Sequence, residues 1–297
     1  MRISRSTGAK ACASSFSSEP EVAACSQRGI AEQSARRHIR VSTALSGKVA
    51  IVTGAAGGIG RAVSREMATQ GARVLLCDVA ADALADAVGE LAEGGLDVAG
   101  CVTDIRTRAG NQRLVEEALR CFGRIDVFHA NAGIAPFEDL LEASEGSIAH
   151  TLDVNLEGAI HGCAAVLPVM TRQRSGVILL TASVAAFVGD PTVPVYGATK
   201  GGLTALCKSL AVRHGPDGIR CVTLCPGDVR TPMLEAYLQR EDDPEAALLA
   251  MTERYPLRRV AEPEDIARLA AFLASDAAGW ITGTDVVIDG GLSARCY

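Results

Sequence analysis

From residue 48 onward, short apolar runs alternate with longer amphipathic stretches. The short runs are rich in β-branched residues and predict seven strands: KVAIVT (48–53), RVLLCD (73–78), DVAGCVT (97–103), DVFHA (126–130), SGVILLTA (175–182), IRCVTLC (219–225) and DVVID (285–289). The stretches between them predict helices near residues 59–70, 80–92, 107–122, 144–171, 196–214 and 263–274. Near-continuous apolar strands are typical of a parallel sheet covered on both faces, because a half-exposed sheet alternates apolar and polar positions. We therefore expect one α/β domain, a doubly wound parallel seven-stranded sheet with helices on both faces.

Residues 1–45 lack this pattern. They are rich in Ser, Ala and Arg and carry few large apolar residues, so we expect a disordered extension, with the domain covering residues 46–297. The extension has no apolar central region of the kind a secretory signal requires, and it matches an organellar transit peptide only in part. A cytoplasmic location is expected, with organellar import as the alternative.

Composition excludes several classes of protein. The net charge of -6 argues against nucleic acid or an anionic membrane as the main partner, because either favours a basic surface. No apolar run reaches the roughly 20 residues that a membrane-spanning helix needs. The ten cysteines include no close C-x-x-C pair and no Cys/His cluster with zinc spacing, and Cys77, Cys221 and Cys225 fall in predicted strands. We expect reduced, buried thiols and no metal site.

The segment TGAAGGIG, residues 53–60, follows the first predicted strand and leads into a helix. Glycines allow the backbone to approach a pyrophosphate, and a helix N-terminus presents free N–H groups and a partial positive charge. The spacing of Gly54, Gly57, Gly58 and Gly60 alone fits a tight turn equally well. The strand, loop and helix context favours the phosphate loop of a Rossmann-type dinucleotide site.

Asp78 ends the second predicted strand. A carboxylate at this place can accept hydrogen bonds from an adenosine ribose, and it repels a 2′-phosphate. No Lys or Arg within several residues offsets its charge, so NAD is predicted as the cofactor and NADP is less favoured. The same Asp could also cap the helix that begins near Ala80, which is compatible with cofactor binding.

YGATK places Tyr196 and Lys200 four residues apart on one face of a predicted helix. A tyrosine that acts as a base near neutrality needs its pKa lowered by about 3 units, roughly 4 kcal/mol. A cation about 4 Å away supplies that amount in a moderately screened site. Taken alone, a Y-x-x-x-K pattern is more often a helix start with a solvated lysine.

A series of ordered motifs favours a cofactor loop over a simple tight turn, and a catalytic Tyr196 and Lys200 pair over a helix start with a solvated lysine. They are TGAAGGIG (53–60), ANAG (130–133), VNLEG (154–158), LLTASVAA (179–186) followed by YGATK (196–200), CPGDVRTPM (225–233) and ITGTDVVIDGG (281–291). With these motifs, residues 46–297 resemble the classical short-chain dehydrogenase/reductase (SDR) family. The resemblance implies an NAD(P)-dependent oxidoreductase that transfers a hydride between a nicotinamide and a secondary alcohol or ketone.

The resemblance also implies a catalytic set of Asn155, Ser183, Tyr196 and Lys200. Tyr196 is expected to exchange a proton with the substrate oxygen, and Ser183 to hydrogen-bond that oxygen. Lys200 is expected to lower the pKa of Tyr196 and to hold the nicotinamide ribose. Asn155 is expected to position a water that links Lys200 to solvent.

Further residues are implied at the cofactor. Asp104 resembles the adenine-contacting Asp, although it could simply cap a turn or helix; Thr231 and the backbone of Val229 are expected to bind the carboxamide. The full expected set is Gly54, Gly57, Gly58, Ile59, Gly60, Asp78, Val79, Asp104, Ile105, Asn131, Ala132, Gly133, Tyr196, Lys200, Pro226, Gly227, Val229 and Thr231. One departure is visible, because Ala130 replaces the first of the family's paired Asn residues and His129 stands where a large apolar residue is usual. This departure leaves one cofactor-side or sheet-stabilising hydrogen bond unassigned, and a lone His in a buried strand is expected to be a core residue.

The substrate is expected to contact Ser183, Phe187, Tyr196 and Met233. The wider set of candidates is Ala135, Pro136, Phe137, Val184, Phe187, Asp190, Val193, Met233, Leu234 and Tyr237. Because this wall is largely apolar, we predict a medium-sized cyclic or alicyclic secondary alcohol or ketone, hydroxysteroid-like or dihydrodiol-like. Residues 231–256, which include the acidic REDDPE, are expected to form a lid.

Two other functions stay open. An NADPH-dependent 3-oxoacyl thioester reductase has the same motifs, but Asp78 disfavours NADPH. A dinucleotide-binding sensor or scaffold without turnover would be expected to have lost Ser183, Tyr196 or Lys200, and all three are present. The segment 262–291 resembles the family's subunit-contact region, which implies a homotetramer or else a homodimer.

Overall fold

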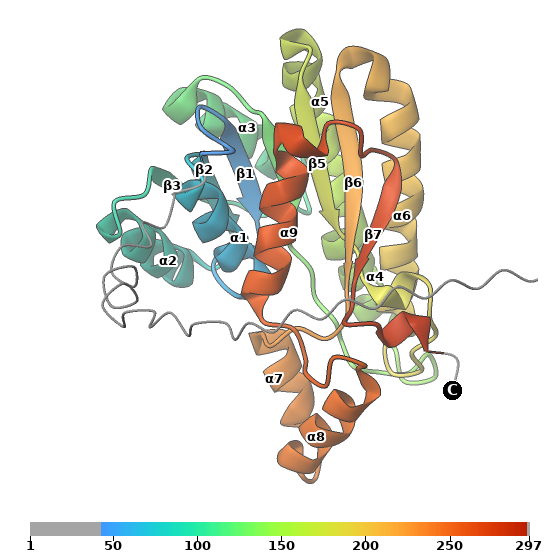
Figure 1. The fold of residues 1–297 in the computed structure, drawn as a ribbon. Coiled ribbons are helices and arrows are strands. Elements are labelled where there is room, and N and C mark those ends of the chain that lie inside the picture. Colours follow the sequence, from blue (N-terminus) through green and yellow to red (C-terminus); the bar gives the residue numbers. More distant parts are fainter. Residues whose placement is uncertain (1–42, 296–297) are drawn as a thin grey trace, which may run out of the picture. The chain divides into compact units, whose positions relative to one another are not determined.

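The structure is a computed structural model that describes residues 43–295 (Figure 1). These residues belong to one compact unit of the chain. The predicted disordered extension lies outside the described residues, except for residues 43–45. Leu45 was assigned to that extension, yet it is fully buried in the core and its N–H donates to the Gln70 carbonyl at 3.1 Å. The ordered fold therefore begins slightly earlier than the hydrophobic pattern predicts.

All seven predicted strands form, and they make one parallel sheet. The strands are β1 (Val49–Thr53), β2 (Arg73–Asp78), β3 (Val98–Val102), β4 (Val127–Ala130), β5 (Gly176–Thr181), β6 (Ile219–Pro226) and β7 (Thr284–Ile288). Their order is β3-β2-β1-β4-β5-β6-β7, and every neighbouring pair is parallel. The order reverses between β1 and β4, and the carboxyl edge at such a switch point is where doubly wound folds bind ligands.

Helices cover both faces of the sheet (Figure 1). They are α1 (Gly58–Thr69), α2 (Ala81–Glu93), α3 (Arg108–Phe122), α4 (Glu145–Leu152), α5 (Gly158–Gln173), α6 (Pro194–His214), α7 (Pro232–Leu238), α8 (Pro244–Arg254) and α9 (Pro263–Ala274). Apolar residues of α1, α2 and α9 share one core with the sheet, and those of α3, α5 and α6 share a second core on the opposite face. The predicted doubly wound α/β fold is confirmed.

The stretch 144–171, predicted as one helix, is divided. α4 runs into a π-helical turn at Asp153–Glu157, and α5 follows without a break. A π turn adds one residue to the helical repeat and is frequent at functional sites. Here it contains the buried Asn155, one of the expected catalytic residues.

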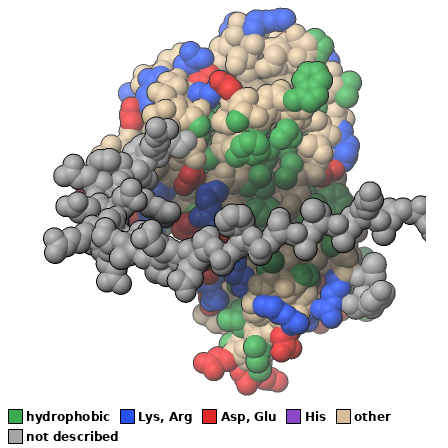
Figure 2. Space-filling model, in the orientation of Figure 1, with side chains coloured by type: hydrophobic (Ala, Val, Ile, Leu, Met, Phe, Trp, Pro, Cys, Tyr) green, Lys and Arg blue, Asp and Glu red, His purple; other side chains and the backbone are tan. Residues whose placement is uncertain are grey.

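The chain between β6 and α9 contains two helices that the hydrophobic pattern did not predict, α7 and α8 (Figure 1). They enclose a small core of their own, made by Leu234, Leu238, Met251, Tyr255 and Val260. Figure 2 shows acidic side chains gathered at the tip of this excursion, where residues 241–245 are exposed. The segment expected to form a lid is thus a folded helical pair.

Within residues 43–295, no helix is long and apolar enough to cross a membrane.

The seven cysteines in the same range have free thiols, and five of them lie in the sheet or in α6. Burial raises the pKa of the Cys225 thiol to about 11. That thiol is therefore a neutral, unreactive core group near neutrality.

Candidate active site

A cavity of about 460 Å³ opens at the carboxyl edge of the sheet. Most of the expected cofactor residues line it: Gly54, Gly57, Gly58, Ile59, Asp78, Val79, Asp104, Ile105, Asn131, Ala132, Gly133, Tyr196, Lys200 and Thr231. Gly60, Pro226, Gly227 and Val229 do not line it; Gly60 lies in the first turn of α1, Pro226 ends β6, and Gly227 and Val229 lie in the loop that follows β6. Met233, expected at the substrate, lines the same cavity.

Three of the four loop glycines are required by the protein itself. Gly54 has φ of +64°, and a Cβ there would lie 2.8 Å from the Cα of Ala132. Gly58 has φ of +53°, which disfavours any side chain. A Cβ on Gly60 would collide with the carbonyl oxygen of Gly54 and would lie 2.8 Å from Nδ2 of Asn131. These positions explain the tight strand-to-helix turn.

Gly57 differs from the other three. Its φ of -157° is open to any residue, and a Cβ there would meet no atom within 4 Å. Gly57 lines the cavity and immediately precedes α1, whose first turn has neither a capping side chain nor an acidic residue. Packing does not explain this glycine, whereas an anion held by the N–H groups of α1 does. The residues present therefore fit the pyrophosphate of a dinucleotide.

Asp78 is fixed by two backbone N–H groups. Its Oδ2 accepts from Ala56 at 3.0 Å, and its Oδ1 accepts from Ala80 at 3.0 Å. The carboxylate thus links the glycine loop to the start of α2 at the edge of the cavity. Both of the roles considered for this residue, a helix-start cap and a ribose acceptor, are compatible with this position.

The structure adds a cation to this part of the cavity that the sequence did not suggest. Arg106 lines the cavity beside Asp104; its Nη2 donates to Asp104 Oδ2 at 2.6 Å, and its Nη1 lies 3.4 Å from Nδ1 of His150. The Arg106 hydrogen bond holds the pKa of Asp104 below its usual value. The only signal in the sequence was an Arg two positions after the predicted Asp, and its pairing required the fold.

Tyr196 and Lys200 lie on the first turns of α6, which begins with Pro194 at a position suited to proline. Lys200 Nζ lies 5.2 Å from the centre of the Tyr196 ring and donates to the Thr181 carbonyl at 2.7 Å. Burial raises the pKa of Tyr196 to about 12 and lowers that of Lys200 to about 8. The pKa of Tyr196 therefore lies above its usual value, where the sequence predicted a lowered one, because the removal of this side chain from water dominates. Tyr196 is a neutral phenol, and its pKa is lowered in part by a hydrogen bond with Ser183.

Asn155 and Ser183 both reach the tyrosine and lysine region. Asn155 is buried, and its side-chain amide exchanges two hydrogen bonds of 2.8 Å with the backbone of Ile134. A Cβ on Gly133 would lie 3.3 Å from Lys200 Nζ and 3.4 Å from Asn155 Oδ1, so both the amide and the ammonium lie close to this glycine. The four expected catalytic side chains are therefore gathered in one place.

The expected substrate wall divides into two groups. Phe187 is half-exposed, and Phe137 packs on Tyr237 with ring centres 5.0 Å apart, so these rings are available to an apolar surface. Leu234 and Val193 are buried, and Leu234 packs into the core of α7 and α8. Leu234 therefore does not line the cavity, because the unforeseen α7 packs its side chain into this separate core.

A carboxylate that the substrate prediction omitted lies close to Tyr196. The Tyr255 hydroxyl accepts from the Asp228 N–H at 2.7 Å and donates to Asp228 Oδ2 at 2.7 Å. Burial raises the pKa of Asp228, and the charge of Asp190 raises it further. The charge of Asp228 in turn contributes to the raised pKa of Tyr196. The substrate side of the tyrosine is thus partly acidic.

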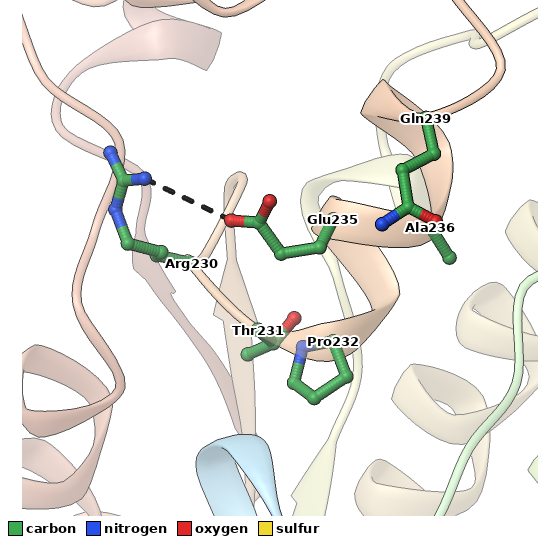
Figure 3. A pocket seen from close by; sticks show the side chains of 6 residues that line it. All are labelled: Arg230, Thr231, Pro232, Glu235, Ala236 and Gln239. Carbon is green, nitrogen blue, oxygen red and sulfur yellow. Dashed lines mark ion pairs between the residues drawn. The ribbon is translucent and has the colours of Figure 1, made fainter. Parts of the chain in front are cut away.

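A second hollow of about 520 Å³ shares Thr231 and Pro232 with the main cavity and is also lined by Arg230, Glu235, Ala236 and Gln239 (Figure 3). Arg230 points toward Glu235, and their charged atoms are 3.9 Å apart. Arg230 also pairs with Glu262 at 3.3 Å. These exposed ion pairs join α7 to the start of α9 beside the cavity.

Comparison with known proteins finds relatives that match most of this chain. A family model described as enoyl-(acyl carrier protein) reductase matches residues 54–293. Oxidoreductase UcpA of Salmonella typhimurium is 40% identical over 250 residues, which cover 83% of this chain and 95% of that protein. L-rhamnose 1-dehydrogenase (NAD(P)(+)) of Azotobacter vinelandii is 39% identical over 251 residues, covering 82% and 96%. The crystal structure of 3-ketoacyl-(acyl-carrier-protein) reductase from Brucella melitensis complexed with NADH superposes with a TM-score of 0.77 at 30% identity, covering 84% of this chain and 99% of that one.

The chain belongs to the classical short-chain dehydrogenase/reductase family. Its members are oxidoreductases that bind a nicotinamide cofactor.

Proposed function

We propose that this protein is an NAD-dependent dehydrogenase that interconverts a secondary alcohol and a ketone. The observation that carries the proposal is that Tyr196 and Lys200 line the same cavity as the glycine loop and Asp78, and that Ser183 and Asn155 lie close to this pair. When bound, the nicotinamide supplies the hydride acceptor or donor.

The protein's own residues handle the proton. The neutral Tyr196 phenol donates its proton to the carbonyl oxygen in reduction and takes it back from the hydroxyl in oxidation. The Ser183 hydroxyl donates to the same oxygen as negative charge develops on it. Lys200, held on the Thr181 carbonyl, keeps a positive charge beside Tyr196 below about pH 8. Because the pKa of Tyr196 is raised to about 12, oxidation is expected to accelerate as pH rises through the alkaline range.

The cofactor preference rests on Asp78. Its two oxygens are oriented by backbone N–H groups, so the carboxylate cannot easily turn away from a 2′-phosphate. Arg106 also lines this cavity, but it already donates a hydrogen bond of 2.6 Å to Asp104. This arrangement supports NAD over NADP, and it disfavours the alternative of an NADPH-dependent 3-oxoacyl thioester reductase.

The substrate we propose is a cyclic secondary alcohol with one apolar edge. Phe187 and Met233 supply the apolar contact. A second candidate, a more hydroxylated ring such as a sugar, is favoured by the Asp228 carboxylate, whose effect reaches Tyr196. The similarity to an L-rhamnose 1-dehydrogenase supports this second candidate.

We also propose a homo-oligomer, a tetramer before a dimer. Large apolar side chains are exposed on α9 and around β7, and Trp280 is 99% exposed. Val212 of α6 and Ile160 of α5 are exposed as well. A contiguous apolar patch marks an interaction surface, and contact between copies would remove these side chains from water. Light scattering of the purified full chain that gives a monomer mass would overturn this proposal.

The test of the function is reduced-nicotinamide formation by the purified protein with NAD and with NADP, across apolar cyclic alcohols and sugars. Turnover with NAD is expected, and the Tyr196→Phe variant should lose it while it still binds NAD. Equal turnover in this variant would refute the role of the tyrosine. NAD binding without turnover on any substrate would instead support the dinucleotide-sensor alternative.

A further inference from the structure

His129 occupies a place where no catalytic role was expected, yet it is hydrogen-bonded. It lies in β4, fully buried, and its Nε2 is 2.8 Å from the Thr181 hydroxyl. The Thr181 hydroxyl is 3.1 Å from Asn131 Oδ1. Nδ1 of His129 has no partner within residues 43–295. The three side chains thus form a hydrogen-bonded series that leads from the buried His129 to Thr181 and Asn131, which line the cofactor cavity.

The position of each proton in this chain can be assigned. Asn131 Nδ2 donates to the carbonyls of Thr53 at 3.1 Å and of Gly54 at 3.4 Å, so its Oδ1 is the acceptor that faces Thr181. The single hydroxyl proton of Thr181 is therefore given to Asn131. The bond between His129 and Thr181 can form only if His129 Nε2 carries the proton. His129 is thus a neutral imidazole protonated at Nε2, with a bare Nδ1.

Burial, together with the nearby charge of Lys200, lowers the pKa of His129 to about 3. The ring therefore stays neutral across the range in which the protein would work. Lys200 is the charged group that faces this region from α6, through its bond to the Thr181 carbonyl. A neutral donor avoids repulsion with that ammonium.

At its other end, this hydrogen-bonded series reaches Asn131, which contacts the backbone of the glycine loop. Asn131 Nδ2 occupies the place that a Cβ on Gly60 would enter, directly under the first turn of α1. The Asn131 backbone N–H also donates to the Thr53 hydroxyl at 3.0 Å. The orientation of the Asn131 amide therefore fixes the carbonyl of Gly54, and with it the turn that presents the α1 N–H groups to the cavity.

We propose that His129 is a positioning residue for the cofactor loop: its Nε2–H donates to Thr181, which orients Asn131 beneath Gly54. The inference rests on the proposed function, because the loop is taken to bind NAD. The inference gives a hydrogen-bonding role to His129, which stands where the family usually has a large apolar residue. It also joins the loop to Thr181, whose carbonyl holds Lys200.

The first test measures NAD binding by isothermal titration with full-length protein and no substrate. His129→Leu removes the donor and leaves the Thr181 oxygen facing an apolar group, so the Kd for NAD is expected to rise about three- to tenfold. His129→Gln keeps an N–H donor and should recover most of the affinity. Phe128→Leu is the matched control, because it alters the same strand but faces the other core. It should lower the Tm without changing the Kd.

Equal NAD affinity in His129→Leu and the wild type overturns the inference, and so does a Phe128→Leu variant that loses as much affinity as His129→Leu. Should His129→Leu fail to fold, the Kd for NAD is measured in Thr181→Val, which removes the hydroxyl between His129 and Asn131, and in Thr181→Ser, which keeps it. The valine variant is expected to lose affinity and the serine variant to keep it, and no difference between them counts against the proposal.

A second measurement needs no variant. In wild-type protein labelled with ¹⁵N-histidine, one imidazole should show the Nε2–H tautomer and should not titrate between about pH 5 and about pH 9. If every imidazole titrates, or if the only invariant one is protonated at Nδ1, the proposal is wrong. If the wild type binds neither NAD nor NADP, the proposed function fails, whereas this spectrum still tests the proton assignment.

Discussion

Gly57 offers the sharpest separation of cofactor binding from folding. In Gly57→Ala the new methyl meets no protein atom within 4 Å, and the φ of -157° suits alanine. Alanine is a poorer residue than glycine before a helix, but it also restricts the unfolded chain, and these effects nearly cancel. We expect the free energy of unfolding to change by less than about 0.5 kcal/mol.

The effect on NAD binding should be much larger. Gly57 lines the cavity at the N-terminus of α1, so the methyl enters space that the pyrophosphate needs. Forcing one extra methyl into a filled site costs about 1 to 3 kcal/mol. At about 1.4 kcal/mol for each factor of ten, the Kd for NAD should rise about 5- to 150-fold.

Isothermal titration and thermal unfolding of the same preparations test this prediction against two other glycines. Gly89→Ala lies on the exposed side of α2 with no atom within 4 Å, so it should stabilise the protein by about 0.5 to 1 kcal/mol and leave the Kd unchanged. Gly60→Ala collides with the Gly54 carbonyl and should lower both stability and affinity. A Gly57→Ala variant with wild-type affinity would refute our assignment of the pyrophosphate to this loop.

Three further predictions concern charge. Asp78→Asn removes the charge that repels a 2′-phosphate, so the ratio of kcat/KM for NADP to that for NAD should rise about tenfold or more, and an unchanged ratio would contradict our account of cofactor choice. Asp228→Asn removes a charge that helps to raise the pKa of Tyr196, so the alkaline rise of kcat for alcohol oxidation should move to lower pH; a shift to higher pH would refute the coupling. Lys200→Met should lose turnover, and its free energy of unfolding relative to the wild type should fall as pH rises. The reason is that Lys200 has a pKa of about 8 in the folded protein and about 10.4 in the unfolded chain. Below pH 8 the wild type must bury a charged lysine, which lowers its free energy of unfolding, and this cost disappears by about pH 10.4. Denaturant titrations from pH 7 to above the unfolded pKa would show no such trend if the lysine is not buried as described.

Much of this fold could be predicted from local pattern. Seven strands that bury both faces must read as continuous apolar runs, and helices between them must be amphipathic, so their number and class follow from periodicity alone. The motifs around Gly54, Ser183 and Tyr196 were recognisable because each requires residue types that few other structures need. The α7 and α8 pair was missed, since its core is small and its helices are short.

The sequence by itself determined which side chains could do chemistry, because a glycine loop, an acidic strand end and a Tyr/Lys pair are properties of residue type and spacing. Only the tertiary structure decided how strongly each one acts. The pKa of Tyr196 is raised because burial dominates it, and burial depends on what the folded chain packs around a group. Three hydrogen bonds likewise depend on distances that only the folded protein sets. They join Arg106 to Asp104, Tyr255 to Asp228, and His129 to Thr181. Such distances are set by the packing of the whole domain, which no local stretch of sequence contains.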